Sequence, residues 1–454
     1  FADHSVLDRA PHRDVHPGGS GQVMALTFAL VTLCVSFTLF LLLGLPVAFA
    51  IALSCILTYL AEGLPLATAF QSMISGMNVF SFLAIPFFIF SGELMLHGGI
   101  ADKIVDFAKS VAGHVRGGLG MSNVLACTLF GGVSGSPVAD VSAMGAVLIP
   151  QMKKEGYDVD YAVNVTTHAS LVGALMPTSH NLIIFALAAS GKVSIAALIL
   201  AGIVPAVVLT LCNSAAAYGV AVKRGYPAGS FPGWAIVWRS FLQSLPGLLV
   251  VVIIITGILS GAFTATESAS VAVLWALFLA SVVYKKLTKE QFLKAAAKAV
   301  KSTGAVLLLI GISSMFGYLI GLYGVAELTG KMLASVSSEP WVIFLWVNII
   351  LFVLGTFLDM AATILICTPI FLPICQQMGM STEQFGIVLF INCALGLNTP
   401  PVGTTQFVGC TIGGISVGEV MKTILPFYSG LIVALMLVTY VPAFSMWLPN
   451  LVLK

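Results

Sequence analysis

The sequence predicts an all-α polytopic membrane protein, built as an inverted repeat with two re-entrant helical hairpins. First, 59% of its 454 residues are hydrophobic and only 8% are charged, whereas a soluble domain carries about 25% charged residues. Second, apolar stretches of bilayer-spanning length follow one another, and two of them are interrupted by small and polar residues. Third, the segments around these interruptions repeat at a nearly constant offset.

The two ends of the chain are expected to lie outside the spanning helices. Residues 1–22 are polar and contain Pro and Gly, and no basic segment precedes the apolar run. We therefore predict a polar tail or linker rather than a cleaved signal peptide. Residues 449–454 are predicted to form a short C-terminal tail. The eight cysteines include no C-x-x-C pair, so we interpret them as small membrane hydrophobes.

A spanning helix needs roughly 20 apolar residues. Such runs predict spans at 24–43, 45–61, 79–97, 160–190, 195–222, 236–260, 264–284, 303–323, 384–411 and 419–447. The segments 119–152 and 341–375 are apolar but interrupted, which predicts hairpins. The amphipathic segments 100–116 and 285–301 are predicted to lie as arms along the membrane surface.

The basic residues orient these segments. The densest basic cluster, in 285–301, is predicted to be cytoplasmic by the positive-inside rule; its members are Lys285, Lys286, Lys289, Lys294, Lys298 and Lys301. Counting spans from this cluster places Arg116 and Lys153 on the cytoplasmic side, so segment 119–152 enters from the cytoplasm and returns to it. The immediate flanks of 341–375 fall outside and contain no Lys or Arg. We therefore predict hairpins that enter from opposite faces.

An internal repeat explains why the two predicted hairpins enter the membrane from opposite faces. Residues 92–111 align without gaps on 317–336, and six positions are identical. Asn123 and Asn348 keep the same offset, and Asp140 and Asp359 each precede a proline by ten residues. Repeats of opposite orientation are the architecture of many secondary transporters.

The predicted organisation follows from the repeat. Scaffold helices and the start of the first repeat are predicted at 23–91, and the first repeat follows at 92–222, with hairpin 119–152 and broken helix 160–190. Further scaffold helices and a cytoplasmic basic arm are predicted at 223–302. The second repeat is predicted at 303–448, with hairpin 341–375 and broken helix 384–411.

The interruptions predict half-helices that begin near the middle of the membrane. In "SGSPVAD", Ser136 is predicted as an N-cap with Pro137 at the first helical position. In "GTFLD", we predict a capping box from Thr356 to Asp359. Free N–H groups and helix dipoles at these ends favour an anionic substrate group.

Two further helices are predicted to break, at "LMPTSHN" (175–181) and "LNTPPVG" (397–403). Proline removes a donor and frees a carbonyl one turn earlier. Freed carbonyls and hydroxyls provide the hard oxygen ligands that suit Na⁺. One hairpin tip beside one broken helix would make one cation site, and the repeat predicts two.

These motifs carry a family resemblance. "GGVSGSPVADVSAMGAVLIP", "TFLDMAATILICTPIFLPI" and "LGLNTPPVG" resemble the large membrane subunit, the M-type permease, of tripartite ATP-independent periplasmic (TRAP) transporters. The resemblance implies an elevator-type, Na⁺-coupled importer of organic acids in the bacterial inner membrane, and no enzyme. It also implies a small four-helix membrane subunit, separate or fused, and a periplasmic substrate-binding protein. The Na⁺ ligands it implies are Ser134, Ser136, Gly355, Thr356, Thr399, Pro400 and Gly403.

Two departures from the family pattern bear on the substrate. The first break reads "MPTSHN", and polar residues 404–406 follow "TPPVG". Added polar groups at these places could recognise extra hydroxyls, which favours a sugar acid over a plain dicarboxylate. We predict substrate contacts at Ser136, Pro177, Thr178, Ser179, His180, Asn181, Asn398 and Thr404.

Several residues leave alternatives open. Asp140 and Asp359 either bind a cation or a proton directly, or serve in helix capping and compensation of the helix dipole, and the second role is favoured. Glu267, in "TATE" (264–267), is interpreted as part of a capping box rather than as an ion-coupling group. His180 is either a substrate contact or an interior histidine. Asn123 and Asn348 either touch the substrate or form hydrogen bonds within the helix bundle, and hydrogen bonding is favoured.

Two other function classes are compatible with parts of the sequence. "GVSG" (132–135) matches the motif of intramembrane serine proteases, with Ser134 as nucleophile and His168 or His180 as base. A stand-alone anion or citrate carrier with a related elevator fold is the second alternative. Dependence of uptake on Na⁺ would exclude the protease.

Overall fold

The computed structural model describes residues 19–189 and 193–453, so most of the predicted tail at 1–22 lies outside the described residues. The described residues fall into two compact parts, one that ends at Gln71 and one that begins at Ser72. In the first part, α1 (Gly19–Leu42) and α2 (Val47–Ala61) pack side by side. α3 (Leu66–Met77), which the sequence analysis did not predict, spans the boundary between the two parts.

In the second part, the first repeat opens with a short 3₁₀ turn (Phe80–Leu83) and α4 (Ala84–His97), followed by α5 (Ile100–Ala112). The predicted first hairpin consists of α6 (Gly118–Ser134) and α7 (Pro137–Lys154), which contact each other and are joined by two residues. α8 (Val159–Ser170) continues into a 3₁₀ turn (Leu171–Leu175), and α9 (His180–Ala188) follows after a bend of 51°. This is the predicted break at 175–181. α10 (Ile195–Lys223) closes the repeat.

The central helices are α11 (Trp234–Leu259), α12 (Ala265–Phe278) with a π turn (Leu279–Val283), and α13 (Lys289–Leu322). Thr264 and Glu267 form the predicted capping box. The predicted basic arm at 285–301 differs from the structure, because its residues from Lys289 onward and the following span form one continuous helix. No helix breaker separates them, and the Ala- and Lys-rich sequence favours helix.

The second repeat contains α14 (Val325–Val336), the hairpin helices α15 (Pro340–Phe357) and α16 (Met360–Gln377), and the broken helix α17 (Thr382–Leu397) and α18 (Thr404–Gly413). The short α19 (Val417–Met421) follows. The span predicted at 419–447 instead forms α20 (Leu425–Tyr440) and α21 (Ala443–Val452), which are bent by 55°.

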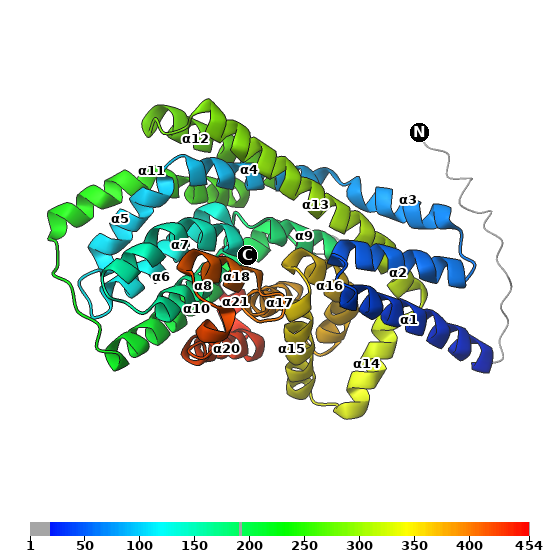
Figure 1. Ribbon diagram of the computed structural model, residues 1–454. Coiled ribbons are helices and arrows are strands. Elements are labelled where there is room, and N and C mark those ends of the chain that lie inside the picture. Colours follow the sequence, from blue (N-terminus) through cyan, green and yellow to red (C-terminus); the bar gives the residue numbers. More distant parts are fainter. Residues whose placement is uncertain (1–18, 190–192, 454) are drawn as a thin grey trace. The chain divides into compact units, whose positions relative to one another are not determined.

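The two repeats make equivalent contacts. α6 packs on α8, and its counterpart α15 packs on α17. The second helix of each hairpin crosses to the other repeat, so that α7 contacts α18 and α16 contacts α9 (Figure 1). Gly99 and Gly324 precede α5 and α14 in the same left-handed conformation, with φ of 81° and 59°. These reciprocal contacts confirm the repeat that the sequence predicts.

The helices suit a bilayer. Every regular element in 19–189 and 193–453 is a helix, and seven of these helices are long and apolar enough to cross a membrane, or up to nine if each bent pair is one span. Small residues allow close packing: α12 packs against α4 and buries Ala269, Ala272 and Ala276 completely. Close approach at small residues is the usual way in which membrane helices associate.

Candidate functional site

The tip of the first hairpin rests on the first broken helix. α6 ends at Ser134, Gly135 adopts φ of +64°, and Ser136 caps α7 with Pro137 in its first turn, as predicted. A Cβ on Gly135 would lie 2.5 Å from the carbonyl of Thr178. The Thr178 hydroxyl donates to the Gly132 carbonyl at 3.0 Å. Only glycine combines this backbone conformation with so close an approach.

Asp140 stabilises this tip, but not as a cap. Ser136 takes the N-cap position, while the Ser134 hydroxyl donates to Asp140 Oδ1 and accepts from the Ser136 backbone N–H at 3.2 Å. The other oxygen, Oδ2, is buried and has no hydrogen-bond partner among the described residues. The capping part of the prediction for Asp140 is therefore wrong, because the serine before the proline already occupies that position. Its place in the first turn of α7 agrees with the predicted compensation of the helix dipole.

The tip of the second hairpin rests on the second broken helix in the same way. A Cβ on Gly396 would overlap the carbonyl of Gly355, and the Thr356 carbonyl accepts from the Val402 backbone N–H at 3.3 Å. Asp359 caps α16 by accepting from the Ala361 N–H at 3.2 Å, as predicted.

The predicted capping box from Thr356 to Asp359 is wrong. Thr356 lies inside α15, and its hydroxyl donates to the Val353 carbonyl at 2.7 Å. Because α15 runs on through Phe357, the acid itself becomes the cap of the next helix.

A tyrosine that the sequence analysis missed completes the second break. The Tyr428 hydroxyl, from α20, lies 2.7 Å from the Thr399 hydroxyl and donates to the Asn398 carbonyl at 2.8 Å. Gly403 is the N-cap of α18 with φ of 32°, and a Cβ there would lie 3.1 Å from the Thr399 carbonyl. No local motif marks Tyr428, since the contact spans 29 residues.

Several polar atoms at the two breaks are buried and have no hydrogen-bond partner within the described part of the chain. They are Asn181 Oδ1, Asn398 Nδ2, Thr404 Oγ1 and both amide atoms of Gln406. Buried polar groups are normally paired, so such a group needs an explanation. A ligand bound at the breaks would supply the missing partners. The first three residues are predicted substrate contacts.

Three of the predicted residues line one cavity. Ser134, Ser136 and His180 border a cavity of about 250 Å³. The same lining includes two residues that the sequence analysis did not assign to the site, Glu93 of α4 and Lys298 of α13, which form an ion pair at 2.8 Å. Lys298 was interpreted only as part of the cytoplasmic cluster.

Other predicted residues lie elsewhere. Thr178 and Ser179 are buried in the contact with the hairpin tip. Pro177 lines a separate, mainly apolar cavity of about 310 Å³ between α10 and α11. The lining of the 250 Å³ cavity includes none of the second set of predicted Na⁺ ligands. That set surrounds the second break through the Thr356–Val402 and Gly403–Thr399 contacts.

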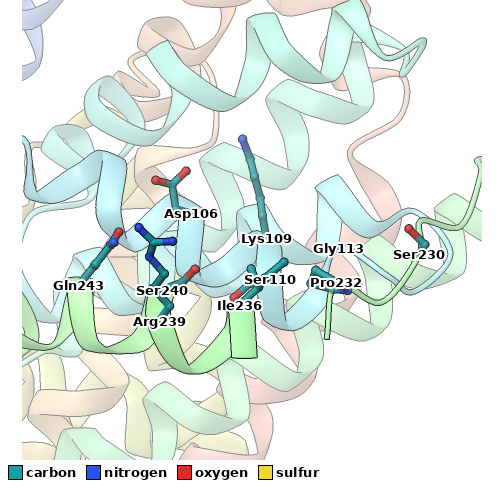
Figure 2. Close-up of a pocket in the computed structure, with 10 residues that line it drawn as sticks. All are labelled: Asp106, Lys109, Ser110, Gly113, Ser230, Pro232, Ile236, Arg239, Ser240 and Gln243. Atoms are coloured by element: carbon teal, nitrogen blue, oxygen red, sulfur yellow. The ribbon is translucent and has the colours of Figure 1, made fainter. Parts of the chain in front are cut away.

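A larger open pocket contains none of the predicted site residues. Figure 2 shows this pocket of about 630 Å³ between α5 and the start of α11, and its lining includes Asp106 and Lys109 of α5 and Arg239 and Gln243 of α11. It lies away from both hairpin tips, so we do not assign it to the site.

The arrangement at Ser134 does not match a protease. Its hydroxyl donates to Asp140 rather than to a histidine. His168 Nδ1 instead lies 2.8 Å from the Asn164 carbonyl. The geometry is that of paired hairpin tips on broken helices, which is the arrangement of a transporter.

Comparison with known proteins decides the family. The model of the DctM component of tripartite ATP-independent periplasmic transporters matches residues 34–444. The chain belongs to this family. It is therefore a transport protein of the bacterial inner membrane and not an enzyme, which excludes the protease alternative.

Curated relatives of this DctM-family permease cover nearly its full length. It is 39% identical to the uncharacterized protein YgiK of Salmonella typhimurium over 93% of this chain and 98% of that protein. It is 32% identical to the C4-dicarboxylate large permease DctM of Rhodobacter capsulatus, over 90% and 96%. It is 34% identical to the sialic acid large permease SiaM of Vibrio cholerae, over 90% of this chain and 96% of that protein.

Solved structures share the fold of the permease at low sequence identity. The YdaH transporter of Alcanivorax borkumensis matches with a TM-score of 0.57 and 12% identity, over 85% of this chain and 90% of that one. MtrF of Neisseria gonorrhoeae matches with a TM-score of 0.55 and 12% identity, over 84% and 83%. These likenesses show the fold alone.

Proposed function

We propose that this permease couples inward movement of Na⁺ to import of an organic acid, by an elevator movement of the two hairpins and two broken helices. The observation that carries this proposal is the reciprocal packing of the repeats. Each tip rests on a break of its own repeat, while α7 contacts α18 and α16 contacts α9. Elements interlocked in this way can move as one body without opening the site.

The anionic solute is held by helix ends. α7, α9, α16 and α18 all begin at the interruptions, and helix N-termini present free N–H groups and positive dipole ends. The unpaired atoms of Asn181, Asn398 and Thr404 lie at the same places. An acid bound there would satisfy them.

The Na⁺ ions would compensate the charge of the acid. An uncompensated carboxylate within a bilayer costs several kcal/mol. Ser134 and Ser136 would provide oxygens at the first site. Gly355, Thr356, Thr399, Pro400 and Gly403 would provide them at the second. Carbonyl oxygens have two lone pairs, so the Thr356 carbonyl can accept from Val402 and still bind a cation.

The proposed substrate class comes from the relatives and from the breaks. The relatives are named for C4-dicarboxylate, sialic acid and 2,3-diketo-L-gulonate. The buried unpaired atoms of Thr404 and Gln406 favour a solute that carries hydroxyl groups.

Two partners complete the proposed system. Tripartite systems include a small membrane subunit and a periplasmic binding protein, and the binding protein would deliver the acid here. The small subunit is separate or fused. Two relatives are longer than the matched region, because the match covers 67% of the permease SiaT and 65% of DctMQ.

The test is uptake into liposomes that contain the permease, a small subunit and a binding protein, with external Na⁺ replaced by choline. Uptake should require Na⁺. Ser136→Ala, Thr356→Ala and Thr399→Ala should each raise the Na⁺ concentration for half-maximal uptake about tenfold, a loss of about 1.4 kcal/mol. Thr256→Ala is the matched control, because that exposed hydroxyl bonds only within its own helix.

Uptake that stays unchanged when choline replaces external Na⁺ would refute Na⁺ coupling. Na⁺-dependent uptake that needs no binding protein would favour the stand-alone carrier. Unchanged Na⁺ dependence in all three variants would show that the ligand assignment is wrong.

A further inference from the structure

The carboxylate of Glu93 is buried and only half satisfied. Its side chain is 7% exposed, and Oε1 accepts from Lys298 Nζ at 2.8 Å. Oε2 is buried and has no hydrogen-bond partner among the described residues. His97 Nε2 lies 3.9 Å away, which is too far for a hydrogen bond. Removing a charge from water is costly unless all of its lone pairs are satisfied, so the free oxygen needs an explanation.

This ion pair faces the tip of the first hairpin. Gly92, next to Glu93, lies against the tip, because a Cβ there would lie 3.4 Å from the Ser134 carbonyl oxygen. Glu93 and Lys298 share the 250 Å³ cavity with Ser134, Ser136 and His180. The cavity therefore has one wall from the hairpin and the first break, and another from α4 and α13.

The second wall offers two complementary groups side by side. Lys298 carries three N–H donors and spends one of them on Glu93, while Glu93 Oε2 can only accept. A plain carboxylate gains from Lys298 but is repelled by Glu93. A hydroxylated acid satisfies both groups once the Glu93 side chain turns its buried Oε2 toward the cavity, since its carboxylate binds the ammonium and a neighbouring hydroxyl donates to Oε2.

We propose that Glu93 and Lys298 form a wall of the solute site that recognises hydroxyl groups. This wall selects hydroxylated acids over acids with the same carbon skeleton that lack hydroxyl groups. The inference rests on the proposed function and narrows its substrate class. A cavity of about 250 Å³ lies just below the range of roughly 300–1,000 Å³ found for drug-sized ligands, which suits a small acid.

The experiment compares acids that differ only in hydroxyl groups. Purified permease in NaCl is titrated with succinate, L-malate and tartrate, and with D-gluconate as a longer acid, and binding is followed by thermal stabilisation. The wild type should bind tartrate at least tenfold more tightly than succinate. Glu93→Gln should weaken the binding of tartrate about tenfold and should leave the binding of succinate unchanged or make it tighter. Lys298→Gln should weaken every acid.

The ratio of tartrate to succinate affinity separates recognition from structural damage, because damage weakens both acids alike. The double variant Glu93→Gln/Lys298→Gln removes both charges and should lose the preference if Glu93→Gln alone does not fold. Lys294→Gln is the matched control, since that lysine pairs with Glu290 on the exposed face of the same helix.

An unchanged ratio in Glu93→Gln and in the double variant would overturn the inference and leave the proposed function standing. A wild type that binds these acids without preferring the hydroxylated ones would overturn it too. If no acid stabilises the wild type and uptake assays find no acid transported, the proposed function fails and the inference fails with it.

Discussion

Glycine sets the distance between each hairpin tip and its broken helix. Gly135 needs its left-handed φ of +64° and also lies against the backbone of Thr178. Gly396 has ordinary helical geometry, but its α-carbon faces the carbonyl of Gly355 so closely that a methyl group would overlap it. At this second contact, glycine is required for space and not for conformation.

We predict that Gly396→Ala destabilises the protein by about 1–3 kcal/mol, the usual cost of overpacking a tight contact. Because the added methyl pushes the tip of hairpin α15–α16 from the break, the Na⁺ requirement of uptake should also rise. Thermal unfolding in detergent and uptake in liposomes measure the two effects. Gly418→Ala, where a Cβ meets nothing within 4 Å, should change neither. Wild-type stability in Gly396→Ala would show that the contact relaxes freely.

Among the helices, an asparagine at the equivalent position of each repeat bonds its hairpin to the broken helix. Asn123 of α6 donates to the Thr166 hydroxyl of α8 at 2.7 Å. In the second repeat, Asn348 of α15 accepts from Asn392 of α17 at 2.7 Å. The expectation that Asn123 and Asn348 bond within the bundle is thus confirmed.

We predict that Asn392→Leu destabilises the protein by about 0.6–2 kcal/mol, the range for hydrogen bonds between membrane helices. The substitution leaves the side-chain oxygen of Asn348, Oδ1, without its donor. Asn348→Leu/Asn392→Leu should cost less than the sum of the single variants, because removing both partners leaves neither amide of this pair unsatisfied. A double-mutant cycle by thermal unfolding measures this coupling. Additive effects would mean that the two amides do not stabilise each other.

At the scale of the whole molecule, the contact between α4 and the tip of the first hairpin allows the proposed movement of the tip to be tested. α4 lies outside the hairpins and broken helices that we propose to move, and a Cβ on its Gly92 would lie 3.6 Å from the Ser134 α-carbon. In an elevator movement this contact breaks in each cycle.

A disulfide between Gly92→Cys and Ser134→Cys should therefore stop transport when oxidised, and reduction should restore it. The reduced double variant is expected to need more Na⁺, because Ser134 is a proposed ligand. Both single variants, assayed under the same oxidant, control for the eight native cysteines. Transport at the reduced rate in fully cross-linked protein would contradict an elevator movement of this hairpin.

Much of the fold and part of the site could be predicted from local chemistry. The breaks at 175–181 and 397–403 are marked by Pro with Ser, Thr and Asn, which interrupt helices by their own geometry. Thr356 was misassigned because the end of a helix depends on tertiary packing as well as on the capping pattern. Helix α14 was missed although its counterpart α5 was predicted, since its amphipathic pattern is weaker.

The sequence by itself determined the membrane class, the repeat, the two hairpins and the two breaks, because hydropathy and helix breakers act over a few turns of chain. Only the tertiary structure decided which distant groups meet there. Tyr428 reaches Thr399, and Glu93 pairs with Lys298 on one wall of the cavity. Such contacts join helices far apart in the chain, and their geometry depends on packing that no local pattern records.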